Sequence, residues 1–281
     1  MLKLTKEQAK HHREAAELVT SQERLSAEEV EFVLLHWQEA STITNPLDGA
    51  FFTPLEMAKD LALHIGGSRV IDLCAGIGHL AWGYRCRYVN DWERDKPPLE
   101  LVCVEKNPAY VEVGRRLLPE ATWICADIFD VAEMDLGYFD DAVANPPFGR
   151  INRAGRQAPR YRGPLMEYHV IDVAAELARS GTFIVPQTSA PFRYSGVRRS
   201  AWEKPLTYRR FVEQTGVHLG FNIGIDTTYY RDSWHGVQPR TEIVTADLST
   251  RIARTSVART ATAVRPHVAS RPGPPVPQPL F

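Results

Sequence analysis

Short apolar runs alternate with helix-like segments from about residue 50 to residue 250, and this alternation constrains the fold more than any other feature of the chain. Seven runs have the length and composition of β-strands, at 69–75, 99–104, 122–128, 140–144, 181–185, 219–229 and 242–248. Helices are expected between them, at 54–65, 108–118, 169–178 and 207–214. This order predicts an α/β fold with a mostly parallel, seven-stranded sheet covered on both faces. Because no helix separates the last two strands, we expect them to form a C-terminal antiparallel hairpin.

The two ends of the chain differ from this central region. Residues 5–20 and 26–41 are expected to form helices, and Ser26 with Glu29 has the spacing of a capping box. Residues 251–281 hold five arginines, six prolines and no acidic residue, which predicts a disordered basic tail. We therefore expect an N-terminal helical extension over 1–48, a main domain over 49–250 and a tail over 251–281.

The composition is that of an ordinary globular protein, with 44% hydrophobic and 24% charged residues. The N-terminus has no apolar stretch of the kind that a secretory signal needs, and no run approaches the roughly 20 apolar residues that span a membrane. None of the four cysteines has C-x-x-C spacing, so no metal site is expected. These features predict a cytoplasmic protein that does not bind membranes.

A turn containing two glycines follows the first predicted strand. It reads Asp72-Leu-Cys-Ala75-Gly76-Ile-Gly78 and leads into a helical stretch. Glycines let the backbone turn tightly and approach a ligand closely, and parallel sheets bind ligands at the carboxyl ends of their strands. Taken alone, the two glycines are equally compatible with a plain turn.

Acidic residues end the next two predicted strands. Glu105 lies 27 residues after Gly78, where a carboxylate suits the two hydroxyls of a ribose. Asp127 ends the third strand and can accept the exocyclic amine of an adenine, with Ile128 against the ring. The missing third glycine argues against a dinucleotide site. Because the glycine turn and the two acids follow successive strands, we interpret them together as a site for a nucleoside-containing cofactor and not as unrelated surface residues.

This series resembles the S-adenosylmethionine-dependent methyltransferases, which have a seven-stranded Rossmann-like sheet. The resemblance implies that Ala75, Gly76 and Gly78 hold the methionine part of the cofactor, that Glu105 holds the ribose, and that Asp127 and Ile128 hold the adenine. It implies that Asp72 organises the glycine loop. Upstream, Phe52-Thr53-Pro54 looks like the F-x-T-P segment of amino-methyltransferases, which touches the methionine end. Thr53 as an N-cap with Pro54 at the first helical position is an alternative interpretation.

The fourth predicted strand is followed by Asn145-Pro146-Pro147-Phe148. An amino group conjugated to a ring is a poor nucleophile, because its lone pair is delocalised. An asparagine carbonyl and a backbone carbonyl can each accept one of its hydrogens and direct the lone pair at a methyl donor. The prolines would hold both acceptors in place, and Phe148 offers a face for an unstacked base. No general base is required, and we expect His79 and His169 to be structural.

The sequence N-P-P-F resembles the catalytic motif of enzymes that methylate amino or amide nitrogens. With the F-x-T-P segment, it looks most like the adenine-N6 DNA methyltransferases, in particular the modification subunits of type I restriction systems. The resemblance covers about residues 50–187 and implies catalytic roles for all four residues of the motif, with Asn145 also beside the cofactor. The chain departs from that pattern in its glycine loop, in a charged insertion at 84–98, and in lacking a large target-recognition domain.

Basic residues crowd the segment after this motif. Residues 150–210 contain twelve lysines and arginines against four acidic residues, with Tyr161, Phe192, Tyr194 and Trp202 among them. This pattern predicts nucleic-acid binding, DNA more than RNA, through five arginines directly after the motif: Arg150, Arg153, Arg156, Arg160 and Arg162. A separate specificity subunit is compatible with the sequence, which does not identify one.

The prediction is therefore a DNA adenine-N6 methyltransferase that uses S-adenosylmethionine. Three alternatives stay open from the sequence: methylation of RNA at adenine N6 or guanine N2, methylation of a protein glutamine amide, and a catalytically inactive nucleic-acid-binding protein with the same fold. The intact Asn145–Phe148 motif disfavours the last of these.

Overall fold

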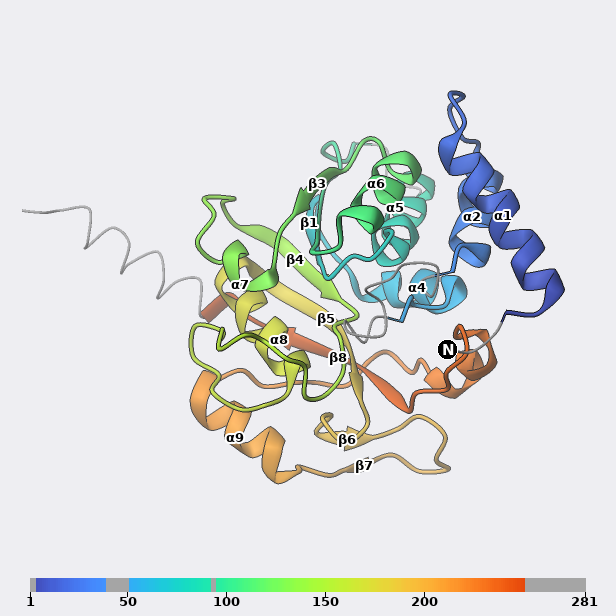
Figure 1. The fold of residues 1–281 in the computed structure, drawn as a ribbon. Helices are drawn as coiled ribbons and strands as arrows, with labels where there is room; N and C mark the ends of the chain where they lie inside the picture. Colours follow the sequence, from blue (N-terminus) through green and yellow to red (C-terminus); the bar gives the residue numbers. More distant parts are fainter. Residues whose placement is uncertain (1–3, 39–50, 92–94, 251–281) are drawn as a thin grey trace, which may run out of the picture.

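The computed structural model describes residues 4–38, 51–91 and 95–250, and it contains a six-stranded sheet of order β3-β2-β1-β4-β5-β8 (Figure 1). The strands are β1 (Arg69–Leu73), β2 (Glu100–Glu105), β3 (Thr122–Cys125), β4 (Phe139–Ala144), β5 (Ala178–Pro186) and β8 (Thr241–Asp247). The first five are parallel, and β8 runs antiparallel to β5. The predicted α/β architecture with an antiparallel edge is confirmed.

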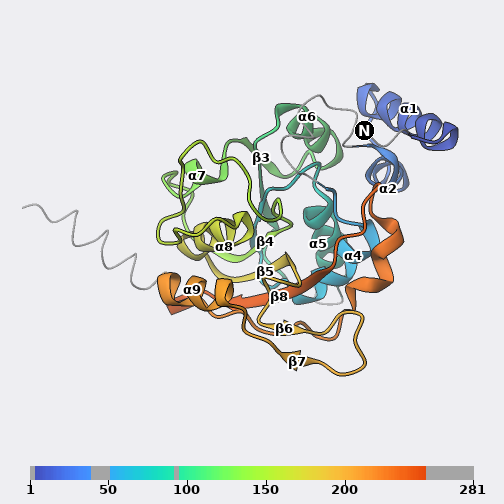
Figure 2. The same ribbon diagram turned by 60° about the horizontal axis from the view of Figure 1, so that its bottom comes forward.

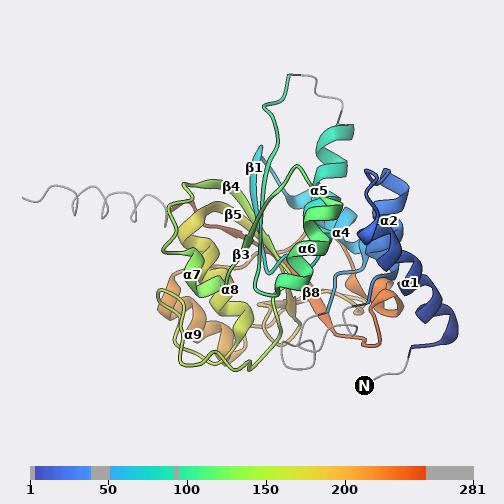
Figure 3. The ribbon, with the colours of Figure 1, turned by 45° about the horizontal axis from the view of Figure 1, so that its top comes forward.

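Helices cover both faces of the sheet (Figure 3). One layer holds α4 (Leu55–Leu61), α5 (His79–Asn90) and α6 (Pro108–Leu117), and the other holds α7 (Ile128–Val131), α8 (Met166–Leu177) and α9 (Leu206–Thr215). Successive side chains of a strand point to opposite faces. Accordingly, Val70 and Val143 belong to the first hydrophobic core, whereas Ile71 and Ala142 belong to the second.

The predicted C-terminal hairpin is wrong in one of its strands. Among the described residues, segment 219–229 contributes only a single bridge, between Gly220 and Thr245, and then enters a 3-10 helix, η3 (Thr227–Ser233). Its apolar residues resemble a strand, but Asn222 Oδ1 accepts hydrogen bonds from the backbone N–H groups of Gly224 (2.6 Å) and Ile225 (2.7 Å). This side-chain turn competes with sheet pairing and reduces the described main sheet from seven strands to six.

A second, two-stranded sheet lies beyond β8 and was not predicted. It consists of β6 (Phe192–Arg193) and β7 (Ala201–Trp202), which pair antiparallel and are seen next to β8 in Figure 2. The loop between these strands carries Arg198 and Arg199, both exposed.

The N-terminal helices, α1 (Lys6–Thr20) and α2 (Ala27–His36), pack on the α4–α6 side of the molecule (Figure 3). The capping box at Ser26 is confirmed, because Ser26 Oγ accepts from Glu29 N at 3.2 Å and Glu29 Oε2 accepts from Ser26 N at 2.7 Å. The helix predicted over 26–41 ends at His36. The domain boundaries stay predictions, and the predicted tail at 251–281 lies outside the described residues.

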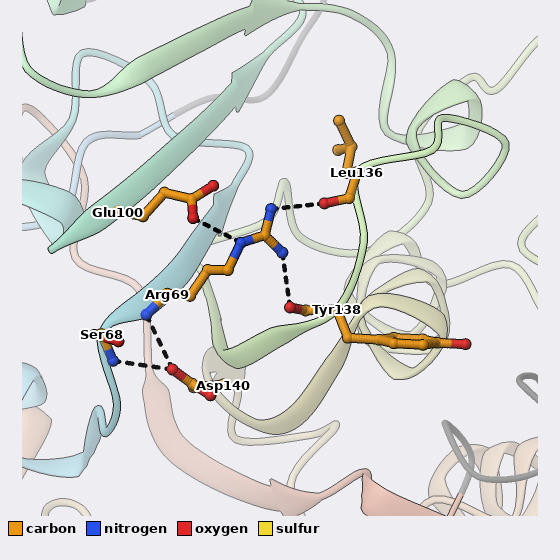
Figure 4. A network of polar contacts seen from close by, with 6 residues as sticks. All are labelled: Ser68, Arg69, Glu100, Leu136, Tyr138 and Asp140. Atoms are coloured by element: carbon orange, nitrogen blue, oxygen red, sulfur yellow. Dashed lines mark hydrogen bonds and ion pairs between the residues drawn. The ribbon is translucent and has the colours of Figure 1, made fainter. Parts of the chain in front are cut away.

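A polar network fixes the strand starts at the edge opposite the glycine loop (Figure 4). The Arg69 guanidinium donates to Glu100 Oε2 at 2.7 Å and to the backbone carbonyls of Tyr138 (2.7 Å) and Leu136 (2.6 Å). Asp140 Oδ2 accepts from the backbone N–H groups of Ser68 and Arg69. One arginine and two carboxylates therefore hold β1, β2 and β4 in register, which aligns the carboxyl ends of the same strands.

Candidate active site

A cleft lies at the carboxyl ends of β1, β2, β3 and β4, with an empty volume of about 1000 Å³ that includes its opening to solvent. Ten of the residues predicted for the site line it: Phe52, Thr53, Asp72, Ala75, Gly76, Glu105, Asp127, Ile128, Asn145 and Pro147. Ligands of open parallel sheets bind at this position, at the carboxyl ends of the strands. Four predicted residues, Pro54, Gly78, Pro146 and Phe148, do not line the cleft and lie behind or beside its wall.

The glycine loop forms the floor of the cleft. Gly76 has a φ of +57°, and a Cβ there would lie 3.0 Å from the Phe52 ring. Gly78 has a φ of +100° and is the N-cap of α5, where a Cβ would crowd Leu118 and Trp123 instead of the cleft. Gly76 is thus required where the loop meets the Phe52 ring at the cleft, whereas Gly78 is required for packing and for the start of the helix.

Asp72 lies 1% exposed beneath this loop. Its Oδ2 accepts a hydrogen bond from Ala81 N in α5 at 3.2 Å, so the side chain ties β1 to the helix after the loop. Burial raises the pKa of Asp72 to about 8, although the Ala81 hydrogen bond opposes the shift. Asp72 Oδ1 is buried and has no hydrogen-bond partner among the described residues. A buried carboxyl oxygen without a partner at a cleft wall fits a cationic ligand group, such as the amino group of a methionine moiety, which would favour the ionised form of Asp72.

The two acids at the ends of β2 and β3 both hold backbone N–H groups. Glu105 Oε2 accepts from Gly76 N at 2.9 Å and Oε1 accepts from Asn107 N at 2.7 Å, so Glu105 couples the β2 end to the glycine loop. Asp127 caps α7 by accepting from Phe129 N at 3.1 Å. A carboxylate oxygen has two lone pairs, so one that accepts a backbone bond can also accept from a ribose hydroxyl or an adenine amine.

The Phe52-Thr53-Pro54 segment forms one wall. The Phe52 ring is buried against the rings of Trp37, His79 and Tyr110, with ring centroids 5.2–5.9 Å apart. Thr53 is buried at the cleft. Pro54, not Thr53, is the N-cap of α4, and no side-chain hydrogen bond caps that helix. The alternative role of Thr53 as an N-cap is therefore wrong.

Asn145 stands where this wall meets the loop after β4. Its Nδ2 donates to the Phe51 carbonyl oxygen at 2.9 Å, which fixes the orientation of the side-chain amide. Asn145 Oδ1 has no hydrogen-bond partner among the described residues and remains a free acceptor. Pro146 is buried, Pro147 lines the cleft, and the half-buried Phe148 packs against the first hydrophobic core.

Sequence reasoning missed the residue that supports this loop. Glu167, at the start of α8 and 1% exposed, accepts from Gly149 N at 2.8 Å through Oε2 and from Ser189 Oγ at 2.6 Å through Oε1. Gly149 has a φ of +78°, which glycine adopts without strain. The available signal was an acid in a largely apolar helix that also holds Asp172 and Glu176, since buried acids are rare unless they are paired.

Three of the five arginines after the motif are engaged within the protein, and nucleic-acid binding by the five stays a prediction. The side chains of Arg153 and Arg162 donate to loop carbonyls at Arg156, Ala158, Pro159, Tyr161 and Gly163. Arg156 pairs with Asp130 and, at 3.5 Å, with Asp127. Arg150 and Arg160 are exposed, and their side chains have no partner in the part of the chain that the structure describes. Of the five, only Arg153 lines the cleft.

The aromatic residues among these arginines are also mostly structural. Tyr161 and Phe192 are buried, whereas Trp202 is 58% exposed. His169 accepts from Ala158 N through Nδ1 at 3.1 Å, so its Nε2 is the atom that donates to the Gly163 carbonyl at 2.9 Å. Burial lowers the pKa of His169 to about 4, and the ring is a neutral brace for the loop. The structural role expected for His169 fits this geometry.

Within residues 4–38, 51–91 and 95–250, no cluster of three or more histidine, cysteine, aspartate or glutamate side chains could hold a metal ion. No helix in that part of the chain is long and apolar enough to cross a bilayer.

Comparisons with known proteins support the fold. The structure is similar to a modification subunit of a putative type I restriction enzyme from Vibrio vulnificus, with a TM-score of 0.52, 12% identity, and coverage of 80% of this chain and 50% of that one. It also matches a type I methyltransferase subunit from Streptococcus thermophilus (TM-score 0.48, 15% identity, 79% and 50% coverage) and a putative RNA methyltransferase from Pyrococcus horikoshii (0.45, 17%, 79% and 96%). No protein-family model and no curated protein matches the sequence.

The similarity to the Vibrio subunit shows the Rossmann-like methyltransferase fold. The chain spans about half the length of the Vibrio subunit that it matches.

Proposed function

We propose that this protein is an S-adenosylmethionine-dependent methyltransferase that acts on the N6 amino group of adenine in DNA. The observation that carries the proposal is the arrangement of Asn145. Its amide is anchored by the Phe51 carbonyl oxygen and it lines a cleft with Oδ1 unpartnered among the described residues. The methyltransferase fold of the chain supports the same conclusion.

The residues at the cleft fit S-adenosylmethionine. Asp72 would pair with the methionine amino group, the backbone at Gly76 would lie beside the methionine part, Glu105 would accept from the ribose, and Asp127 would accept from the adenine amine. The bound cofactor supplies an electrophilic methyl group on a sulfonium sulfur. Asp127 shares its carboxylate with the half-exposed Arg156 at 3.5 Å, so an adenine amine would have to coexist with that ion pair.

Asn145 is proposed to orient the target amine. Its Oδ1 accepts one amine hydrogen and a backbone carbonyl of the loop accepts the other, which directs the nitrogen lone pair at the methyl group. The bond from Asn145 Nδ2 to Phe51 O prevents the amide from turning its donor toward the amine. Pro146 and Pro147 restrict the backbone, so both acceptors are held in place before the substrate arrives.

The test is transfer of a tritiated methyl group from S-adenosylmethionine to DNA, RNA or protein, followed by mass spectrometry of the labelled product. We expect N6-methyladenine in DNA. Label in RNA, at adenine N6 or guanine N2, or label in a protein glutamine would replace the substrate assignment. If the cofactor does not bind in calorimetry, the methyltransferase proposal itself is wrong.

Asn145→Ala separates chemistry from binding. It should reduce transfer by at least about 100-fold, as the loss of a preorganised acceptor does elsewhere, and leave the Kd for S-adenosylmethionine within a few-fold. Asn152→Ala is the matched control, because Asn152 also lines the cleft but its Oδ1 accepts from Ala154 N at 3.0 Å. Activity retained in Asn145→Ala would contradict the proposed role of the amide.

A further inference from the structure

A second cleft opens at the carboxyl end of β5 and the start of β8. Three arginines, Arg193, Arg231 and Arg240, are the only charged residues among the described ones that line it, and the remaining wall is largely polar or glycine. A lining with three guanidinium groups and no carboxylate is suited to an anion, because guanidinium forms paired hydrogen bonds with phosphate oxygens.

These guanidinium groups are available for a ligand, unlike most of those after the catalytic motif. Arg193 and Arg240 are exposed and form no ion pair within the described part of the chain, and Arg231 is 59% exposed and reaches only Asp232, at 3.5 Å. Arg198 and Arg199, in the loop between β6 and β7, are also exposed and unpaired among the described residues. Free positive charge therefore lies at β6, η3 and the start of β8, in addition to that of Arg150 and Arg160.

The acids near the cleft are already engaged. Glu242 is fully buried, and its carboxylate accepts from Gln187 Nε2, from the backbone of Tyr194 and from Ser195, at 2.8–3.1 Å. Asp226 accepts from Gly196 N and from Thr228. Both carboxylates reduce the positive field, but neither lines the cleft, so an anion entering it would meet guanidinium and hydroxyl groups first.

The sheet register places this cleft on the same edge as the catalytic loop. Ala144, the last residue of β4, is paired with Phe183, and Pro186, three residues further along β5, is paired with Thr241. With about 3.3 Å per residue and about 4.8 Å per strand, the two sites lie on the order of 15 Å apart. Figure 2 shows β4, β5 and β8 in succession, with β6 and β7 beyond them. A span of this length corresponds to about four nucleotides of a duplex strand.

We propose that this cleft binds the phosphodiester backbone of the nucleic acid whose base enters the catalytic cleft. The inference rests on the proposed function and names the surface that holds its substrate. Backbone contacts position a nucleic acid without reading its sequence, so the cleft supplies affinity and register. Because few side chains in the lining are apolar, the cleft fits phosphate better than stacked bases.

The experiment compares the triple variant Arg193→Gln, Arg231→Gln, Arg240→Gln with a control that loses the same charge elsewhere, Lys6→Gln, Lys10→Gln, Arg13→Gln on α1. Binding of a fluorescent DNA duplex and of the matching RNA is measured by anisotropy from 50 to 200 mM NaCl. The cleft variant should bind DNA at least about tenfold more weakly at 50 mM and lower the slope of log K against log[salt] by up to about 3, one unit for each phosphate contact. The control should change both by much less.

Three outcomes decide the matter. Equal loss of affinity in both triple variants means that only net charge acts, and it overturns the cleft. Displacement of DNA by a few millimolar inorganic phosphate at constant ionic strength would instead indicate a site for a small phosphorylated ligand, which also overturns it. Methyl transfer by the wild type is measured separately and tests the proposed function. If the wild type methylates DNA but the cleft variant binds DNA normally, the proposed function stands and only the proposed role of the cleft is refuted.

Discussion

Replacing Asp72 with asparagine should stabilise the protein and weaken cofactor binding at the same time. The carboxyl group is 1% exposed, and burial raises its pKa from 3.8 to about 8. Because the folded state binds this proton more tightly than the unfolded state, the wild type loses stability as the pH rises from about 4 to about 8. About three pH units separate pH 7 from the unfolded-state pKa, and at 1.36 kcal/mol per unit the cost is on the order of 4 kcal/mol.

The asparagine variant avoids this cost because its amide is neutral at every pH. Its oxygen can accept from Ala81 N in place of Asp72 Oδ2, and its –NH2 group takes the place of the protonated oxygen. Urea unfolding between pH 5 and pH 7 measures the effect. We expect the variant to exceed the wild type by a margin that grows by about 1.4 kcal/mol per pH unit.

The same substitution removes the carboxyl group proposed to meet the cofactor amino group, a cation that would favour the ionised form of Asp72 on binding. Calorimetry should show S-adenosylmethionine bound about 10- to 100-fold more weakly, the range of one charge-assisted hydrogen bond. Asp141→Asn is the control: burial raises the pKa of Asp141 to about 7, but Asp141 does not line the cleft. It should gain stability with no change in cofactor affinity. A margin for Asp72→Asn that stays constant with pH, or a variant less stable than the wild type at pH 7, would refute the reasoning.

Two further predictions concern the loop after the catalytic motif. Glu167→Ala removes the acceptor that holds Gly149 N, so kcat should fall about 10- to 100-fold while the Kd for the cofactor stays unchanged. Glu167→Gln should recover most of this loss. If Glu167→Ala has the same kcat as the wild type, a positioning role for Glu167 is excluded. His169, whose pKa burial lowers to about 4, should cost the wild type up to about 3 kcal/mol of stability as the pH falls from 6.5 to 4, because the folded state resists protonation. Urea unfolding of His169→Gln, compared with the wild type over this range, should lack that contribution, and parallel pH profiles would contradict it.

Much of the architecture is predictable from the sequence because it depends on neighbours along the chain. The alternation of apolar runs and helical segments predicts the α/β sheet, and the two clusters of strand residues on opposite faces follow from the period of two. The capping box at Ser26 and the glycine loop after β1 depend on a few adjacent residues, and both form where expected. The strand prediction for 219–229 was wrong because another local interaction, the turn formed by the Asn222 side chain, outweighs the strand-like composition of the segment.

The tertiary structure alone decided which polar groups are engaged and which remain free. The bond between Asn145 and Phe51 joins residues 94 positions apart, and the support of Gly149 by Glu167 depends on how α8 packs. Arginines that look equivalent in the sequence divide into braces such as Arg162 and unpaired cations such as Arg240. The positions at which strands end and helices begin depend on propensity and periodicity, which the local sequence contains. The pairing of a charged side chain depends on which distant backbone or side-chain group reaches it after folding, and only the tertiary structure shows this.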